Sequence, residues 1–537
     1  MLTTHLFKSS QLNALKRFYA APPCPATRAS TFIPASTKFT KIMCTVGPAS
    51  ETHDTLTQLI ERGARVFRLN FSHGDFESHG KRLEAIRKAS KALQIPVAIC
   101  GDLQGPKIRV GSVPTSVQVG TTASRSGGGL IHVKQGDTVV LSASAKEAHL
   151  RDDIPVLALT YKDMVHEVEP GHLVLINDGA IRMRAIKAVY DELHCEVLVG
   201  GDITSGKGIN LPESNIKAPA ITEKDWACVE WAMKKDLDYL ALSFVRNAHE
   251  VNELKSKLSK AKNPDPSQQH RLHIISKIEK PQAIENINEI VEASDAIMVA
   301  RGDLGVEMEL AKVPIIQKLI IERCQMYGKP CIIATQMLES MITSVIPTRA
   351  EASDVANAIF DGADAVMLSA ESATGSHPAL VVETMGQIIE ASESHIMTVV
   401  KENVPPTRTA AAHHLTASLA FGAWHVVQET KAKLVVCWSQ HGNAARYLSQ
   451  NDFKIPILAF SEIERTVHQM ALFNGVTPVH MAVPSGTASF IDATEALLLQ
   501  NNLVKKGDLV LFLGGRPLGK SKSTNAMILH EIGSKSV

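Results

Sequence analysis

Short apolar runs recur along the chain from residue 41 onward, and each ends in polar residues before an amphipathic stretch begins. Eight such runs are present, at 42–45, 66–70, 97–102, 239–243, 273–277, 296–301, 331–335 and 365–369. Continuous apolar runs are typical of parallel strands that are buried on both faces. Several of the intervening stretches, such as 280–293 and 311–328, have helical patterns. Eight strand–helix units predict a (β/α)₈ barrel, which places this chain in the α/β class.

Polar residues follow nearly every predicted strand, at the end where barrel enzymes carry their chemistry. In chain order they are Arg68, Asn70, Ser72, Asp102, Ser243, Lys277, Glu279, Arg301, Asp303, Thr335, Ser369 and Glu371. One charged residue at such a rim is more often solvated than catalytic, because loops are exposed. Polar residues recur at this position in almost all of the strand–helix units, which predicts a functional site at this rim.

Two segments depart from the barrel pattern. Residues 110–215 lie between the third and fourth predicted strands and carry alternating runs and glycine-rich turns, which predict an inserted small β-barrel domain acting as a lid. After residue 395, apolar runs at 434–437, 456–460, 476–480 and 509–513 predict an open-sheet α/β domain. A regulatory role for this domain is implied only by the family resemblance described below. The barrel itself is then assigned to 40–109 and 216–395.

Composition narrows the class of protein. The chain has 537 residues, 56 Lys and Arg against 55 Asp and Glu, and 45% hydrophobic residues, which is typical of a globular protein. The balanced charge gives no electrostatic reason to expect nucleic acid as a partner, and no apolar segment is long enough to predict a membrane span. The eight cysteines lack zinc-type spacing, which predicts a reduced, cytoplasmic chain.

The first 50 residues contain no Asp or Glu. This pattern is similar to an organelle-targeting leader, and a disordered basic tail or a start codon placed too early are the other interpretations. Residues 1–39 are therefore left out of the predicted fold.

The strongest chemical pattern joins two carboxylates and one ammonium. Lys277 and Glu279 are two apart, so both side chains leave a strand by the same face. Asp303 follows between Gly302 and Gly305, which allow backbone N–H groups to approach an anion closely. Two carboxylates suit Mg²⁺, which keeps positions for water and phosphate oxygens. The pattern predicts phosphoryl or enolate chemistry; on its own the 276–279 segment would also fit a surface ion pair.

Longer motifs carry a family resemblance. They include KIMCTVGPAS (41–50), RLNFSHG (68–74), GDLQGPKIR (101–109), KGINLP (207–212), MVARGDLGVE (298–307), ATQMLESM (334–341) and DGADAVMLSAE (361–371). Over residues 40–537 the chain resembles the pyruvate kinases. The resemblance implies Mg²⁺-dependent transfer of a phosphoryl group from phosphoenolpyruvate to ADP, the last step of glycolysis, by a homotetramer. Mn²⁺ is an alternative metal.

The resemblance also implies roles for individual residues. Glu279 and Asp303 would hold the metal, Arg68 would clamp the phosphoryl group, and Lys277 would stabilise the transferring phosphoryl group and the enolate. Backbone N–H groups of Ala300, Arg301, Gly302 and Asp303 would bind the substrate carboxylate, with Thr335 hydrogen-bonding it or helping to deliver the proton. The nucleotide phosphates would face Asn70, His73, Arg109 and Lys207.

One departure from the family pattern concerns K⁺. Members that need K⁺ have Thr and Glu where this chain has Leu103 and Lys107, and their K⁺ site uses oxygens equivalent to Asn70, Ser72, Asp102 and residue 103. The Lys107 ammonium would take the place of the cation, because like charges disfavour binding both. The chain therefore resembles the K⁺-independent branch; the alternative is that Lys107 is a solvated rim residue.

A second departure concerns regulation. Ser439 and Gly442 could form part of an anion-binding turn, but Asn443 stands where an Arg often occurs in members activated by fructose 1,6-bisphosphate. Gly515 and Arg516 lie in a second glycine-rich basic loop. These residues predict a site for a phosphorylated effector, with a sugar monophosphate or AMP favoured over fructose 1,6-bisphosphate.

Two other functions stay open at this point. One is another barrel enzyme acting on phosphoenolpyruvate or a pyruvate enolate, such as an aldolase, which would need neither nucleotide nor Lys207. The other is a regulatory pseudoenzyme, although every position implied as catalytic holds a competent residue.

Overall fold

Eight parallel strands close into a barrel in the order β1-β18-β17-β16-β15-β14-β3-β2, which confirms the predicted (β/α)₈ architecture. The computed structural model describes residues 38–119, 129–260, 272–398, 414–519 and 524–534, so the predictions for residues 1–37 lie outside it. The barrel strands are β1 (Lys41–Thr45), β2 (Ala64–Asn70), β3 (Ala98–Asp102), β14 (Tyr239–Leu242), β15 (His273–Ile278), β16 (Ala296–Ala300), β17 (Cys331–Ala334) and β18 (Ala365–Leu368).

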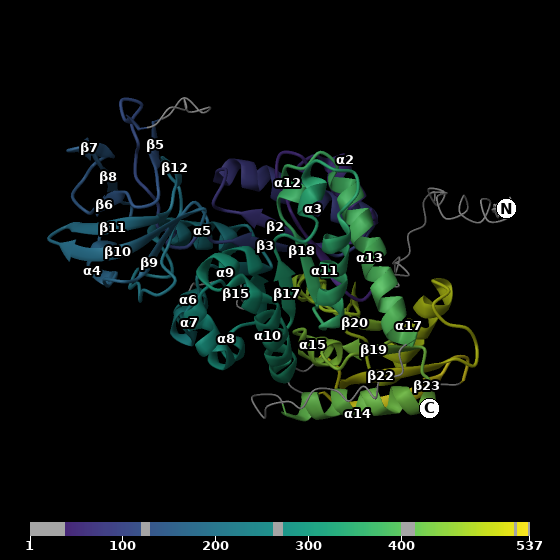
Figure 1. Ribbon diagram of the computed structural model, residues 1–537. Coiled ribbons are helices and arrows are strands. Elements are labelled where there is room, and N and C mark those ends of the chain that lie inside the picture. Colours follow the sequence, from purple (N-terminus) through teal and green to yellow (C-terminus); the bar gives the residue numbers. More distant parts are fainter. Residues whose placement is uncertain (1–37, 120–128, 261–271, 399–413, 520–523, 535–537) are drawn as a thin grey trace, which may run out of the picture. The chain divides into compact units, whose positions relative to one another are not determined.

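Helices cover the outside of these strands (Figure 1). The α-helices of the barrel domain are α2 (His53–Glu61), α3 (Phe76–Leu93), α5 (Glu223–Lys234), α6 (Ala248–Lys260), α7 (Pro281–Glu285), α8 (Ile287–Ala293), α9 (Arg301–Glu307), α10 (Val313–Tyr327), α11 (Arg349–Phe360), α12 (Ala370–Ala373) and α13 (Pro378–Thr398). Local sequence sets where several of them begin. Thr222 caps α5 and Thr348 caps α11, each paired with an acidic residue three positions later.

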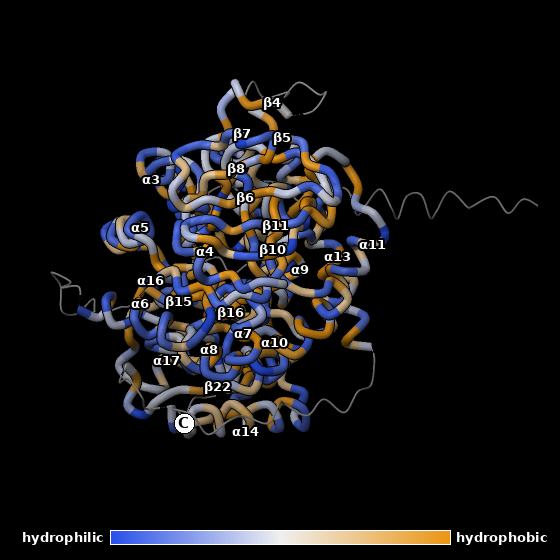
Figure 2. The backbone as a smooth tube through the Cα atoms, turned by 60° about the vertical axis from the view of Figure 1, so that its left-hand side comes forward, coloured by the Kyte–Doolittle hydropathy of each residue, from blue (hydrophilic) through white to orange (hydrophobic). Residues whose placement is uncertain are grey.

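Hydrophobic segments gather in the interior around β15 and β16, whereas exposed helices such as α5 are mostly hydrophilic (Figure 2). All five residues of β16 are buried, as the continuous apolar run predicts. Buried residues inside the barrel, such as Met43 and Ile275, belong to one cluster with buried residues of the C-terminal domain, such as Leu472 and Leu511. The opposite end of the barrel remains available for a site.

The segment between β3 and β14 forms the inserted β domain, called the lid below. A seven-stranded sheet has the order β13-β9-β10-β11-β6-β8-β7, and a three-stranded sheet has the order β12-β5-β4. Their bounds are β4 (Gln118–Val119), β5 (Leu130–Val133), β6 (Thr138–Ser142), β7 (His149–Arg151), β8 (Ile154–Ala158), β9 (Leu173–Ile176), β10 (Ile181–Val189), β11 (Glu192–Val199), β12 (Gly201–Thr204) and β13 (Ile209–Asn210), with the short helix α4 (Met164–Glu167).

The C-terminal α/β domain contains the open sheet β21-β20-β19-β22-β23. Its elements are α14 (His414–Thr430), β19 (Leu434–Trp438), α15 (Asn443–Ser449), β20 (Ile457–Ser461), α16 (Glu464–Met470), β21 (Val476–His480), α17 (Thr487–Gln500), β22 (Leu509–Gly515) and β23 (Thr524–Glu531). Four strands match the predicted runs. The fifth, β23, pairs antiparallel with β22 and was not predicted, since only one of its eight residues is fully buried.

The predicted helix at 280–293 is interrupted in the structure. It is divided into α7 and α8 at Asn286, whose side-chain Nδ2 donates to the carbonyl of Arg246 at 2.9 Å. The predicted helix at 311–328 begins as a 3-10 turn (Leu310–Lys312) and continues as α10. Among the described residues, no helix is both long and apolar enough to cross a membrane.

Candidate active site

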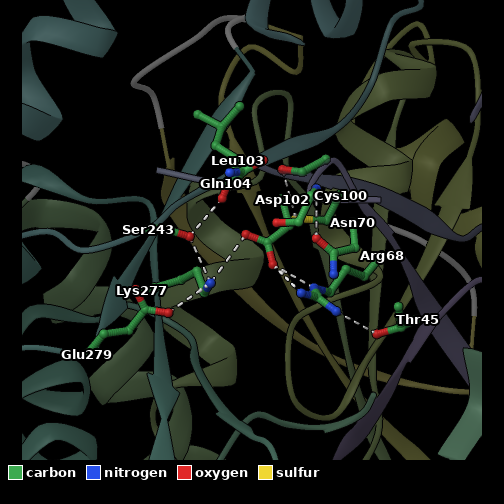
Figure 3. Close-up of polar contacts among 12 residues, drawn as sticks. Thr45, Arg68, Asn70, Cys100, Asp102, Leu103, Gln104, Ser243, Lys277 and Glu279 are labelled. Carbon is green, nitrogen blue, oxygen red and sulfur yellow. Dashed lines mark hydrogen bonds and ion pairs between the residues drawn. The ribbon is translucent and has the colours of Figure 1, made fainter. Parts of the chain in front are cut away.

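A chain of alternating charges crosses the C-terminal rim of the barrel (Figure 3). Asp102 ends β3 and accepts from Arg68 of β2, with Nε and Nη2 both 2.6 Å from its Oδ2. Its other oxygen, Oδ1, lies 3.5 Å from Nζ of Lys277 on β15. The same Nζ lies 2.8 Å from Glu279 Oε1 and donates to Ser243 Oγ at 2.8 Å. Four neighbouring strands of the barrel therefore deliver one connected polar network.

The charged groups of this network are buried, so each one affects the pKa values of the others. The side chains of Asp102 and Glu279 are 2% and 1% exposed. Burial alone would lower the pKa of Lys277, but the carboxylates of Asp102 and Glu279 outweigh burial and raise that pKa above its ordinary value. Burial would raise the pKa of Asp102, but Lys277 and Arg68 keep it below its ordinary value. Lys277 therefore stays an ammonium and Asp102 a carboxylate at neutral pH.

The guanidinium of Arg68 is held in a fixed orientation. Besides its two N–H groups on Asp102, Nη1 donates to Thr45 Oγ1 at 3.0 Å. A guanidinium has five N–H groups, so about two remain for an anion at the rim. Because the fork is already anchored, an arriving anion meets donors that need no rearrangement.

Burial also raises the pKa of Glu279, and the nearby Asp303 carboxylate raises it further, while Lys277 opposes both. These two carboxylates come from the end of β15 and the first turn of α9, as the sequence predicts. No group of three or more metal-type ligands is found among the described residues. Two carboxylates nevertheless fit Mg²⁺, which commonly binds through one or two of them together with water and phosphate oxygens.

Thr335 and the start of α9 are joined directly. Oγ1 of Thr335 accepts from the Gly302 N–H at 2.8 Å and donates to the Ala334 carbonyl at 2.6 Å. Thr335 has φ 71°, which is unusual for a β-branched residue and indicates a conformation imposed by its surroundings. A Cβ at position 302 would lie 3.3 Å from Thr335 Oγ1, so glycine allows this close approach.

The side chain of Arg301 hydrogen-bonds to groups outside the network described above. Its Nη1 donates to Asp354 Oδ1 at 2.7 Å and its Nη2 to the carbonyl of Thr335 at 2.9 Å. This buried guanidinium therefore fixes α9 against the segment after β17. Only the backbone of Arg301 is left for the role that the resemblance implies.

The residues expected at the nucleotide form two pairs. At the barrel rim, the His73 N–H donates to the Asn70 carbonyl at 3.2 Å. At the lid base, Arg109 Nη1 donates to the Gly206 carbonyl at 2.8 Å, and Val110 N–H donates to the carbonyl of Lys207. No hydrogen bond joins the rim pair to Arg109 or Lys207 within the described residues.

Several oxygens of the expected monovalent-cation region already accept hydrogen bonds within the protein. Asn70 Oδ1 accepts from the Ser72 N–H at 3.1 Å, and the Leu103 carbonyl accepts from Ser243 Oγ at 2.7 Å. The Lys107 side chain lies beside Gly208 of the lid base, where an added Cβ would be 3.1 Å from its Cε and 3.8 Å from its Nζ.

The two loops expected to bind an effector leave neighbouring parallel strands, β19 and β22. Ser439 Oγ accepts from the Ala445 N–H at 3.2 Å, and Gly442 has φ 80° at the start of α15. Asn443 Oδ1 accepts from Arg446, whereas the exposed Arg516 donates its N–H to Asn525 Oδ1. Gly515 ends β22, which places it beside the first loop.

Sequence reasoning missed the contribution of Phe244. Its backbone N–H donates to Glu279 Oε2 at 2.7 Å, and its φ is 55°. The ring lies against Gly105, where a Cβ would be 2.8 Å from Cδ2. A backbone donor leaves no side-chain signal, although Gly105 is consistent with a close approach. Thr45, which holds Arg68, was likewise not predicted.

The fold and this rim define a (β/α)₈ barrel enzyme with an inserted lid. The model of the family "Pyruvate kinase, barrel domain" matches residues 37–382, and that of "Pyruvate kinase, alpha/beta domain" matches 417–530. The chain is 38% identical over 497 residues to a pyruvate kinase of Geobacillus stearothermophilus, covering 92% of this chain and 80% of the relative. It is 37% identical over 498 residues to one of Mycobacterium tuberculosis, covering 93% and 99%.

A solved structure gives the same result. A pyruvate kinase from Cryptosporidium parvum superposes with a TM-score of 0.81 at 33% identity, covering 92% of this chain and 96% of that one. The chain therefore belongs to the pyruvate kinase family, whose members are phosphotransferases that require a divalent metal.

Proposed function

We propose that this protein transfers the phosphoryl group of phosphoenolpyruvate to ADP and forms pyruvate and ATP. The observation that carries the proposal is the buried network of Arg68, Asp102, Lys277 and Glu279, which places two fixed cations at a rim that also bears metal-type carboxylates. Phosphoryl transfer requires positioning and electrostatic stabilisation more than covalent help from the protein, and this network supplies both.

Each residue has a separate task in the proposed reaction. Glu279 and Asp303 hold Mg²⁺, or Mn²⁺ in its place, which neutralises negative charge on the substrate when bound. The remaining N–H groups of Arg68 bind the phosphoryl oxygens. Lys277 stabilises negative charge on the phosphoryl group and on the enolate oxygen. Asn70, His73, Arg109 and Lys207 bind the nucleotide phosphates when the lid and rim approach.

The start of α9 binds the substrate carboxylate through backbone N–H groups of Ala300–Asp303. In the structure the Gly302 N–H donates to Thr335 Oγ1, so the substrate carboxylate displaces that hydroxyl at Gly302, and the freed Thr335 hydroxyl can hydrogen-bond the carboxylate. In the reaction, the P–O bond of phosphoenolpyruvate breaks, a bond to an oxygen of the ADP β-phosphate forms, and the enolate takes a proton at carbon. Lys277 is a poor source of that proton because its pKa is raised. Water near Thr335 is our candidate donor.

We further propose that activity does not require K⁺. In this proposal the Lys107 ammonium supplies the positive charge; its side chain lies beside Gly208 at the lid base. The test is pyruvate formation from phosphoenolpyruvate at fixed Mg²⁺, with ADP and K⁺ each present or omitted and Na⁺ absent. We expect turnover that needs ADP but not K⁺. A strong K⁺ requirement would refute the role of Lys107, and absence of turnover under all conditions would favour a pseudoenzyme.

Three further properties follow from family membership as proposals. The protein is a cytoplasmic homotetramer, to be tested by mass in solution, and its N-terminal extension is removed if it is a targeting leader, to be tested on protein from its native source. A phosphorylated effector binds near Ser439, Gly442, Asn443, Gly515 and Arg516. Activity at subsaturating substrate with a sugar monophosphate, AMP or fructose 1,6-bisphosphate tests this site, and no response to any of them would refute it.

A further inference from the structure

A buried cluster joins the lid to the C-terminal end of α9. Asn210 of β13 donates through Nδ2 to Glu307 Oε1 at 2.7 Å, and Lys280 Nζ lies 2.5 Å from the same oxygen. The Glu307 side chain is fully buried and Asn210 is 7% exposed. We call Asn210, Glu307 and Lys280 the lid–helix cluster.

The three residues stand next to functional segments in the chain. Glu307 is the last residue of α9, one helical turn after the candidate metal ligand Asp303. Lys280 directly follows Glu279, the other candidate ligand. Asn210 lies three residues after Lys207 at the lid base. One carboxylate oxygen of Glu307 therefore connects the lid to both segments that carry the metal-type carboxylates.

A second contact joins the same two elements. The lid turn before β10 lies against α9, since a Cβ on Gly179 would be 3.7 Å from Val306 Cγ1. Asn177 and Gly179 have φ of 56° and 82°, so this turn is tightly shaped. Displacement of the lid base would therefore change the environment of α9 at two adjacent residues.

Across the residues that the structure describes, the lid–helix cluster leaves buried polar atoms unpaired, so stabilising the fold is not a sufficient explanation for it. Glu307 Oε2 and Asn210 Oδ1 are buried without a hydrogen-bond partner in the described structure. Partly satisfied buried polar groups cost stability, and an apolar contact would hold the lid to α9 more firmly. A contact that is specific but not strong suits two elements that must separate and rejoin in each catalytic cycle.

We propose that Glu307 is a positioning residue that couples the position of the lid, through Asn210, to divalent-cation binding at Glu279 and Asp303. When the lid contact is made, α9 and the segment after β15 are held at the spacing that binds the cation. This inference rests on the proposed function for the identity of the metal site. Its test uses metal binding itself, which can be measured without turnover.

The experiment measures Mn²⁺ binding to the full-length protein by the electron paramagnetic resonance signal of free Mn²⁺. Asn210→Ala removes the hydrogen bond from the lid to Glu307 and leaves the Lys280–Glu307 pair in place. We expect its Mn²⁺ affinity to fall about fivefold, the equivalent of one ordinary hydrogen bond. At saturating Mg²⁺ its kcat should stay within about twofold of wild type, so the effect appears in the KM for the metal.

Asn215→Ala is the matched control, because this asparagine lies five residues further along and is exposed. It should bind Mn²⁺ like wild type. Glu307→Leu removes the acceptor of Asn210 Nδ2 altogether, whereas a glutamine would keep one. It should weaken binding at least as much as Asn210→Ala, and adding Asn210→Ala to Glu307→Leu should produce no further loss, because both act through one contact.

Unchanged Mn²⁺ affinity in Asn210→Ala would overturn the proposal. Additive losses in the double variant would also overturn it, because they would mean independent effects. A fall in affinity matched by a large fall in melting temperature would show structural damage and would overturn the positioning role. Failure of the proposed function is distinguishable, since it would abolish pyruvate formation in the wild type while the Mn²⁺ comparison still stands.

Discussion

Replacing Arg68 by Lys tests whether the guanidinium fork, and not only its charge, serves the reaction. In the structure three N–H groups of Arg68 are fixed, two by Asp102 at 2.6 Å and one by Thr45 at 3.0 Å. The side chain is 12% exposed, so the remaining donors act where water screens them little. A Lys ammonium keeps the positive charge beside Asp102 but cannot contact Asp102, Thr45 and two phosphoryl oxygens at once.

The expected magnitude follows from the donors lost. Removing one preorganised donor to a developing charge costs roughly 10²–10³ in kcat, about 3–4 kcal/mol. We therefore expect Arg68→Lys to lower kcat/KM for phosphoenolpyruvate about 10³-fold. The melting temperature should change by only a few degrees, because the buried Asp102 carboxylate keeps a cationic partner.

The assay is steady-state pyruvate formation at saturating ADP and Mg²⁺, together with thermal unfolding. Arg151→Lys is the matched control, because Arg151 makes a similar two-pronged contact with Glu192 on the lid and its side chain is 47% exposed. It should leave kcat/KM unchanged. The reasoning is refuted if Arg68→Lys retains more than about a tenth of wild-type kcat/KM, or if it loses activity only because it unfolds.

Two other substitutions test neighbouring parts of the structure. Thr335→Val keeps the shape but leaves the Gly302 N–H without its acceptor, so we expect a destabilisation of about 1–3 kcal/mol and a higher KM for phosphoenolpyruvate, with Thr335→Ser close to wild type in both unfolding and kinetic measurements. For Asp295, burial would raise the pKa, but His273, Lys255 and Lys329 lower it to about 2. Its ionised form therefore stabilises the fold by about 2 kcal/mol above pH ~4, and this contribution is lost as the pH falls towards 2. The free energy of unfolding, measured in urea at a series of pH values, should fall less steeply towards acid pH in Asp295→Asn than in wild type. An equally steep fall in both proteins would contradict the lowered pKa of Asp295.

The barrel could be predicted because its strands are buried on both faces and therefore appear as continuous apolar runs. The predicted strand ends are right to within about one residue, since the ladder stops where a polar residue such as Ser243 or Thr335 turns to the rim. The charged residues of the site share this position at the strand ends, so barrel geometry alone predicts that Arg68, Asp102 and Lys277 meet.

The parts that could not be predicted depend on long-range contacts or on backbone groups. Asn210 and Glu307 are 97 residues apart, and no periodic pattern links them. The N–H of Phe244 contributes to the site through a left-handed backbone that its aromatic side chain does not suggest. Strand β23 is an edge strand with partial burial, so its alternation is too weak to distinguish it from a loop.

The charges at the rim also indicate an order of binding. Arg68 and Lys277 are two cations, whereas Asp102, Glu279 and Asp303 are three carboxylates, so the site bears an excess of negative charge when all five are ionised. Phosphoenolpyruvate is itself an anion, so this excess of negative charge opposes its binding. In the proposed site, a divalent cation bound by Glu279 and Asp303 would reverse this balance. It would also offset the Asp303 repulsion, which adds to burial in raising the pKa of Glu279. We therefore expect the metal to bind the free enzyme first, and the substrate to bind a site whose charge the metal has already reversed.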